Sequence, residues 1–285
     1  MAFSIGIVGA GTRGAGIAHT AALHKCTVSL YDINEEVIRR SVERINFEMK
    51  KSVDKSSISE DDMKEAMSRI RKRTNINDLD TCDVIIDAVL EEVRVKKDLF
   101  KKLDQIAHHT TILATTTSHF SVASIAAATK KPERVVGMHF FYPVHLSKAV
   151  EVVRGVRTSD ETVAKAAEAV KKIGGKPVFT KDTPGQVVNR IQHHLYAEAL
   201  AVAAEGTATY ADIDRIVKLS GGFKQGPFEA LDLNGVEEHH LLTEALYART
   251  YGDPRFRPSA LLQQMTDAGT TGKKTKRGFY NYEVL

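Results

Sequence analysis

The chain has 285 residues, of which 42% are hydrophobic and 27% are charged. This length suits two domains, and the composition excludes a disordered or fibrous chain as the main state. Forty Lys and Arg residues against 36 Asp and Glu give a net charge of +4, less than a nucleic-acid-binding protein usually concentrates. The small excess suits an anionic small-molecule ligand, although an ordinary solvated surface is the simpler explanation.

The cysteine content and the amino terminus bear on the compartment. Cys26 and Cys82 provide neither a disulfide framework nor a metal-binding spacing, so we expect no metal site. No run of 18 or more apolar residues is long enough to span a membrane. The first residues contain neither a secretory leader nor an Arg/Ser-rich presequence, and we therefore expect a cytoplasmic protein.

The first elements of the chain predict a β-α-β unit. Residues 3–8 and 27–32 are β-type runs, and residues 13–24 between them are small and apolar enough for a buried helix. Residues 34–72 then read as helical, with an interruption at 54–59.

Strands and helices continue to alternate up to residue 180. Residues 83–89 form an uninterrupted apolar run, typical of a parallel strand that is buried on both faces. The next predicted elements are helix 93–107, strand 111–115, helix 121–128, strands 134–140 and 149–154, helix 160–173 and strand 177–180. This alternation predicts an α/β domain over residues 1–182, with a doubly wound, mostly parallel sheet of the Rossmann type.

The pattern changes after residue 182. Thr183 can cap a helix that starts at Pro184, and Gln186 would complete a capping box. Apolar residues then recur at helical spacing up to Gly206, and only helices and turns follow as far as residue 270. We therefore predict an all-helical second domain over residues 183–285.

A glycine pattern follows the first predicted strand and opens the first predicted helix. Gly9 allows a tight turn, Gly11 allows the backbone to approach a pyrophosphate, and Gly14 allows close helix–strand packing. The free N–H groups of a helix N-terminus attract phosphate. Asp32 ends the second strand, where a carboxylate accepts hydrogen bonds from the adenosine ribose and repels a 2′-phosphate, which favours NAD over NADP. The alternative interpretation of Asp32 is a cap of the following helix.

Oxidation of an alcohol by hydride transfer needs a base, and a histidine has a suitable pKa. Of the 11 histidines, His139 lies at the carboxyl end of a predicted strand, the edge at which open α/β sheets bind ligands. If residues 143–147 turn, Glu151 on the next strand returns opposite His139 and can orient its ring. The alternative is a strand-end histidine and an unrelated surface glutamate.

Two further polar residues are candidates for substrate contacts. Ser118 follows strand 111–115 at the same edge of the sheet, and its hydroxyl can bind a substrate oxygen or, alternatively, cap the next helix. Asn189 lies early in the helix predicted from Pro184, where a structural role is the alternative.

Together with the glycine loop, these residues resemble the NAD-dependent 3-hydroxyacyl-CoA dehydrogenases, including the short-chain 3-hydroxybutyryl-CoA enzymes. The resemblance extends over nearly the whole chain. It rests on the order and spacing of residues 9–14, 87–92, 137–141, 182–190, 226–229 and 274–280. It implies reversible oxidation of a short-chain (S)-3-hydroxyacyl-CoA by NAD to the 3-oxoacyl-CoA, a reaction of fatty-acid β-oxidation.

The resemblance also implies roles for individual residues. His139 is then the general base in the oxidising direction and Glu151 its partner, while Ser118 and Asn189 position the substrate. The residues implied to contact NAD are Glu91 and Lys96 at its nicotinamide half and Lys274 in the tail, and Lys50 and Lys51 are the nearest candidates for the phosphates of coenzyme A. A homodimer joined through the helical domain is implied as well.

Two positions depart from the family pattern, which usually has asparagine where this chain has Thr116 and Tyr142. They motivate an alternative substrate, a 3-hydroxy acid without CoA such as a sugar acid. A further alternative, of a different class, is an NAD-binding protein of the same fold that has lost catalysis. We expect no binding of nucleic acid or of a membrane.

Overall fold

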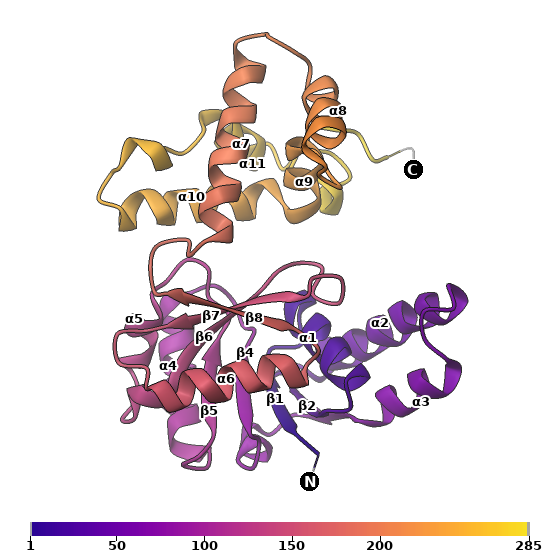
Figure 1. Ribbon diagram of the computed structural model, residues 1–285, viewed down its shortest axis with the longest axis vertical. Helices are drawn as coiled ribbons and strands as arrows, with labels where there is room; N and C mark the ends of the chain where they lie inside the picture. Colours follow the sequence, from indigo (N-terminus) through magenta and orange to yellow (C-terminus); the bar gives the residue numbers. More distant parts are fainter. Residues whose placement is uncertain (1, 284–285) are drawn as a thin grey trace. The chain divides into compact units, whose positions relative to one another are not determined.

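The computed structural model describes residues 2–283 and divides them into two compact units, one ending at Thr183 and the other starting at Pro184 (Figure 1). The first unit contains an eight-stranded sheet with the strand order β3-β2-β1-β4-β5-β6-β7-β8. Its strands are β1 Ser4–Val8, β2 Thr27–Tyr31, β3 Ile70–Arg73, β4 Val84–Asp87, β5 Ile112–Thr115, β6 Val135–Phe140, β7 Ala149–Arg154 and β8 Lys176–Lys181. The predicted doubly wound α/β fold is confirmed.

Helices cover both faces of this sheet, as Figure 1 shows for the lower part of the drawing. One apolar core lies under α1 (Thr12–Leu23), α2 (Glu35–Asp54) and α6 (Asp160–Lys172). A second core lies on the opposite face, under α4 (Val93–Ile106) and α5 (Val122–Ala126). The central strands supply side chains to both cores, which is why their sequences are continuously apolar.

The sheet is parallel except at one junction. β6 and β7 pair antiparallel, whereas β7 and β8 pair parallel, as do all strands from β3 to β6. The antiparallel register puts His139 directly opposite Glu151. Side chains of directly opposed residues lie on the same face of a sheet, so this register brings the imidazole and the carboxylate together.

One prediction in the first unit is wrong. Residues 34–72 are not helical to their end, because α3 (Glu60–Ser68) gives way to β3, an edge strand that pairs with β2. The segment Ile-Arg-Lys-Arg of β3 does not alternate between buried and exposed positions, and none of its four residues is fully buried. Its charged side chains therefore resemble those of the preceding helices.

The second unit is helical in its described residues, as predicted. Its helices are α7 Val188–Ala204, α8 Tyr210–Gly221, α9 Pro227–Asn234, α10 Val236–Arg249 and α11 Ala260–Asp267. Their core contains Tyr196, Leu200, Phe228, Leu231 and Leu262. The capping box predicted at Pro184 is wrong. Gly185 and Gln186 have φ angles of +72° and +45°, outside the helical region, so α7 begins only at Val188.

Two buried aspartates hold the carboxyl-terminal segment against the helices of the second unit. Asp214 accepts hydrogen bonds from the N–H groups of Phe228 and Glu229 at the start of α9 and from the Tyr280 hydroxyl at 2.7 Å. Asp232, at the other end of α9, accepts from the N–H groups of Phe279 and Tyr280 and from the Tyr282 hydroxyl. These donors compensate the loss of water around both carboxylates.

Histidines are also buried in the second unit. The rings of His193 on α7 and His239 on α10 are stacked at a centroid distance of 6.0 Å. Burial, reinforced by the neighbouring His193 and His240, lowers the pKa of His239 to about 3. His239 is therefore neutral in the folded protein near neutral pH.

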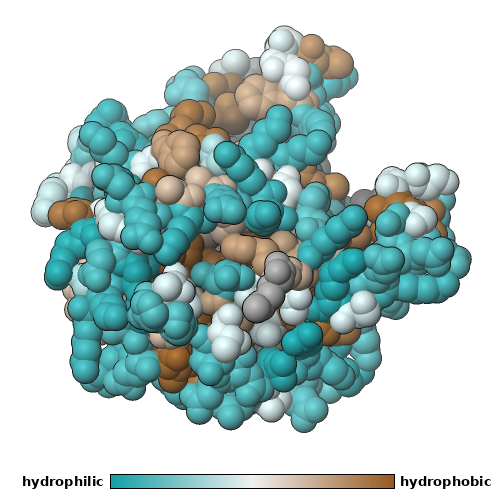
Figure 2. Space-filling view, turned by 60° about the horizontal axis from the view of Figure 1, so that its bottom comes forward, coloured by the Kyte–Doolittle hydropathy of each residue, from teal (hydrophilic) through white to brown (hydrophobic). Residues whose placement is uncertain are grey.

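Within residues 2–283, no helix is both long and apolar enough to cross a lipid bilayer. On the face that Figure 2 shows, hydrophilic side chains predominate and hydrophobic ones occur in small separate groups. Both cysteines are buried as free thiols.

Candidate active site

The glycine loop lies between β1 and α1, at the carboxyl edge of the sheet. Gly9 has a φ of +103°, and a Cβ there would lie 2.6 Å from the carbonyl oxygen of Ala88. A Cβ on Gly14 would lie 1.9 Å from the carbonyl oxygen of Gly9. Gly11, by contrast, faces open space. Only glycine fits the first two positions, while the third leaves room for a ligand to reach the backbone.

The start of α1 suits an anion. Its N-cap is Gly11, which has no side chain to bond the first N–H groups of the helix, and its first turn contains no acidic residue. Asp32 lies beside the loop and is only half-buried. Its carboxylate accepts from the N–H groups of Ala10 at 2.9 Å and Asn34 at 3.1 Å. Asn34, rather than Asp32, is the N-cap of α2.

His139 and Glu151 form a buried pair on β6 and β7. The His139 Nδ1 and Glu151 Oε2 atoms are 2.9 Å apart, and both side chains are almost completely buried. An ionised carboxylate only accepts hydrogen bonds, so Nδ1 carries the proton of the neutral ring and Nε2 has the free lone pair. The Phe141 ring packs edge-on against the imidazole at a centroid distance of 4.9 Å. The pair therefore presents a fixed base.

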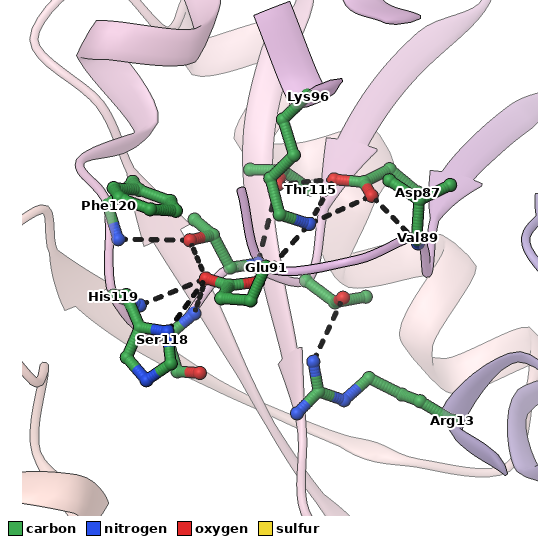
Figure 3. Close-up of polar contacts among 11 residues, drawn as sticks. Arg13, Asp87, Val89, Glu91, Lys96, Thr115, Ser118, His119 and Phe120 are labelled. Carbon is green, nitrogen blue, oxygen red and sulfur yellow. Dashed lines mark hydrogen bonds and ion pairs between the residues drawn. The ribbon is translucent and has the colours of Figure 1, made fainter. Parts of the chain in front are cut away.

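A second ionic cluster lies at the ends of β4 and β5 (Figure 3). Lys96 on α4 donates to both carboxylate oxygens of Asp87, at 2.9 and 3.0 Å, and its Nζ lies 3.3 Å from Glu91 Oε2. The Thr115 hydroxyl also donates to Asp87, at 2.6 Å. Lys96 is fully buried, with 0% of its side chain exposed. The Lys96 ammonium is thus enclosed between the carboxylates of Asp87 and Glu91.

Glu91 accepts hydrogen bonds from the segment that follows β5. Its Oε1 atom accepts from the Thr117 hydroxyl, from the Ser118 N–H at 2.9 Å and from the His119 N–H at 3.0 Å. Burial by itself would raise the pKa of Glu91. The charge of Lys96 and the hydrogen bond from Thr117 outweigh burial, and the pKa lies below its usual range. Glu91 is therefore a carboxylate at neutral pH.

Ser118 is not a helix cap. Ser121 caps α5 by accepting from the Ser124 N–H, and Ser118 contributes only its own N–H, to Glu91. Its half-buried hydroxyl makes no hydrogen bond within the described residues. The Ser118 hydroxyl is thus available to a ligand.

A cavity of about 280 Å³ lies within the first unit, between α1, α2 and the connection from β6 to β7. Its lining includes His19, Arg44, Glu48, Tyr142 and His145. The His19 and His145 rings are stacked at 5.1 Å, and burial lowers the pKa of both. The cavity therefore offers neutral imidazoles next to a cation and an anion.

Four further predicted residues belong to α2 and to the second unit. Lys50 and Lys51 are exposed on α2, and Lys51 pairs with Glu48 at 3.2 Å. Asn189 and Lys274 belong to the second unit. Asn189 is buried near the start of α7 with no partner for its side-chain nitrogen, and Lys274 is exposed in the 3₁₀ turn Lys273–Thr275.

Three site residues were missed by sequence reasoning: Asp87, Thr117 and Arg13. Asp87 has a recognisable signal, an acid that ends an otherwise apolar strand. Thr117 and Arg13 have none, because their roles depend on distant partners. The Arg13 guanidinium makes a long contact of 3.5 Å with the Thr116 hydroxyl and so connects α1 with the segment after β5 (Figure 3).

Within residues 2–283, no group of three or more His, Cys, Asp or Glu side chains is arranged to hold a metal ion.

Comparison with known proteins gives a consistent result over both units. The family model described as the NAD-binding domain of 3-hydroxyacyl-CoA dehydrogenase matches residues 4–183. The model of the C-terminal domain of 3-hydroxyacyl-CoA dehydrogenase matches residues 185–282. A probable 3-hydroxybutyryl-CoA dehydrogenase of Bacillus subtilis is 37% identical over 277 residues, which cover 97% of this chain and 96% of that protein.

Two solved structures are similar over nearly the whole chain. The (S)-3-hydroxybutyryl-CoA dehydrogenase from Ralstonia eutropha has a TM-score of 0.92 and 36% sequence identity, and the match covers 99% of this chain and 100% of that one. FadB2 from M. tuberculosis has a TM-score of 0.94 and 32% identity, with 98% of each chain covered.

Proposed function

The chain belongs to the 3-hydroxyacyl-CoA dehydrogenase family, and we propose that it interconverts short-chain (S)-3-hydroxyacyl-CoA and 3-oxoacyl-CoA, with 3-hydroxybutyryl-CoA as its substrate. It is an NAD-dependent enzyme, as its family is. The substrate length follows the relatives from Bacillus subtilis and Ralstonia eutropha, which are named as 3-hydroxybutyryl-CoA enzymes.

The observation that carries this proposal is the buried contact between His139 and Glu151. In the oxidising direction, Nε2 of His139 takes the proton of the 3-hydroxyl group, and Glu151 stabilises the imidazolium that forms. In the reducing direction the imidazolium returns this proton to the 3-oxo group. Ser118 and Asn189 position the substrate oxygen, a role that the unpartnered Ser118 hydroxyl and Asn189 side-chain nitrogen support.

The residues around the glycine loop fit NAD. Open space at Gly11 and the uncapped start of α1 suit the pyrophosphate, and the partly exposed Asp32 carboxylate suits the two ribose hydroxyls. Bound NAD supplies the hydride acceptor for C3 of the substrate. Glu91 and Lys274 are the residues that we propose to contact the cofactor, with Lys96 acting behind Glu91.

The cavity beside α2 is the proposed place of the pantetheine arm of CoA. Arg44 at its border and the exposed Lys50 and Lys51 further along the same helix supply positive charge for phosphates. Binding of this distant part of the substrate helps to orient C3 for the reaction.

We also propose that the protein is a cytoplasmic homodimer joined through the second unit. Ile216, Leu219 and Phe223, on α8 and just after it, expose 63%, 80% and 50% of their surfaces. Apolar side chains that gather in this way favour burial against a second copy.

A second candidate substrate is a 3-hydroxy acid without CoA. It is favoured by Tyr142, which lines the cavity with 54% of its surface exposed and adds a phenol hydroxyl there. A bulky side chain at this point can reduce the space that is available to a CoA thioester.

Initial rates of NADH oxidation test the proposal, with acetoacetyl-CoA, longer 3-oxoacyl-CoA thioesters and free 3-oxo acids as substrates and NADPH as the alternative cofactor. We expect the highest kcat/KM with acetoacetyl-CoA and NADH. Turnover of free acids without turnover of thioesters would favour the second candidate. NADH binding without turnover of any of these compounds would indicate that catalysis has been lost.

A further inference from the structure

The Lys96 ammonium is paired with two carboxylates within the protein. An ammonium group has three N–H donors, and three carboxylate oxygens surround this one, two from Asp87 and one from Glu91. The side chain has no exposed surface. Lys96 therefore presents no surface of its own to a ligand, and its effect on the reaction passes through its two carboxylate neighbours.

The cluster carries one more negative charge than positive. Asp87 and Glu91 contribute two carboxylates and Lys96 one ammonium, in a region where unpaired charge is costly. His119 is the other titratable group near Glu91, with its Nδ1 at 3.8 Å, and burial lowers its pKa. The Glu91 carboxylate therefore needs hydrogen-bond donors, and the donors present are consecutive groups of residues 117–119.

These donors fix the backbone on both sides of Ser118. The Thr117 hydroxyl donates to Glu91 and accepts from the Phe120 N–H at 3.0 Å, so it closes the turn that contains Ser118. Figure 3 shows the result: Lys96 points from α4 onto Asp87 and Glu91, and Glu91 points into the turn. The Ser118 hydroxyl is the polar group of this turn that remains without a partner.

We propose that Asp87, Lys96 and Thr117 are positioning residues, which act through the Glu91 carboxylate to hold the Ser118 hydroxyl in place for the substrate. This inference rests on the proposed function for its effect on catalysis. The positioning itself is a property of the turn and can be measured without a substrate.

The first test compares Thr117→Val with Thr117→Ser. Valine keeps the shape of threonine but removes the hydroxyl, and serine restores it. Loss of a hydrogen bond to a charged group predicts that kcat with acetoacetyl-CoA falls about ten- to a hundredfold in Thr117→Val. We expect the KM for NADH to change less than about twofold and Thr117→Ser to recover most of the activity. A wild-type kcat in Thr117→Val would overturn the inference.

The second test uses Lys96→Met, with Lys101→Met on the exposed side of the same helix as the matched control. Hydrogen–deuterium exchange of residues 117–120 should become at least about tenfold faster in Lys96→Met and stay unchanged in the control. Without the cation, Glu91 takes up a proton at higher pH, so activity should be lost at a higher pH during acidification. Adding Glu91→Gln should abolish that shift. Unchanged exchange and an unchanged pH profile would contradict the proposal.

The two readouts separate the possible failures. If the wild-type protein turns over no 3-oxoacyl-CoA, the proposed function fails, whereas the exchange measurement still decides whether Lys96 holds the turn. If the wild type is active and both variants behave like it, the inference fails and the proposed function stands.

Discussion

Both units bury carboxylates, but they give them different partners. In the first unit, Glu151 faces an imidazole, which can exchange a proton, and Glu91 faces an ammonium, which balances its negative charge. In the second unit, Asp214 and Asp232 face backbone N–H groups and tyrosine hydroxyls. Burial, followed by the nearby Asp214 and Asp232 carboxylates, raises the pKa of Tyr280 and Tyr282, which keeps these donors protonated.

This difference shows that the burial of an acid does not by itself mark a reactive site. A carboxylate whose donors never titrate can fasten one segment to another, but it cannot assist a proton transfer at neutral pH. The identity of the partner separates the two cases. Substitutions at Glu151 and Glu91 should therefore alter rates, and those at Asp214 and Asp232 should alter stability.

The largest expected effect is on turnover, in His139→Ala. Loss of the general base should lower kcat by about 10²–10⁴-fold, while the Kd for NADH changes little. Steady-state rates and a fluorescence titration with NADH measure the two quantities. Undiminished turnover would exclude His139 from the mechanism. The contrast between a reactive carboxylate pair in the first unit and structural carboxylates in the second would then lose its main support.

A smaller effect, on stability alone, is expected for Asp232→Asn. The amide directs its N–H₂ group at donors that now bind a carboxylate, so the free energy of unfolding should fall by about 2–3 kcal/mol. Urea denaturation measures this change, with the exposed Glu237→Gln as control. At temperatures where the variant is folded, kcat should stay within about twofold of the wild type. A catalytic loss without a stability loss would reverse our assignment of this unit.

Acidification should weaken the second unit through His239. Its pKa is about 3 in the folded protein and 6.5 as the ordinary value, so the unfolded chain binds more protons between these pH values. Stability is therefore lost as the pH falls below about 6.5, by about 2 kcal/mol at pH 5. Urea denaturation at pH 7 and pH 5 should show this loss in the wild type and a smaller one in His239→Leu. Equal pH dependence in both proteins would exclude His239 as the cause.

The smallest effect is expected at the half-buried Asp32. Asp32→Asn keeps the oxygen that accepts from Ala10 but loses the charge that binds ribose hydroxyls. We expect kcat/KM for NADH to fall about tenfold and kcat/KM for NADPH to remain or rise. The ratio of the two constants is the measurement. A fall that is equal for both cofactors would indicate damage to the glycine loop rather than altered recognition.

The regular parts of the fold could be predicted from the sequence, because their signals are local. Continuous apolar runs identified the central strands, and the change of pattern after residue 182 identified the helical unit. The strand β3 was missed because three of its four residues, Arg71, Lys72 and Arg73, are charged and the strand lies at an edge. The start of α7 was missed because the φ angles of Gly185 and Gln186 depend on tertiary structure rather than on capping preferences.

The residues of the candidate site also divide into those with a local sequence signal and those without one. The glycine loop and the strand-end histidine are visible as patterns, and a hairpin turn was enough to expect Glu151 opposite His139. The hydrogen bond between Thr117 and Glu91 was not visible, because the two residues follow different strands and meet only when β4 and β5 are paired. Sequence spacing contains no information about such a meeting.

The antiparallel pairing of β6 and β7 has a consequence for how this protein can evolve. The ladder itself, rather than the eight residues from 141 to 148 that join the strands, sets the facing of His139 and Glu151. The joining residues can exchange side chains, as at Tyr142, while the ladder keeps its alignment. Substrate preference can thus diversify among descendants of one ancestor without any change in the proton-transfer chemistry that they inherit.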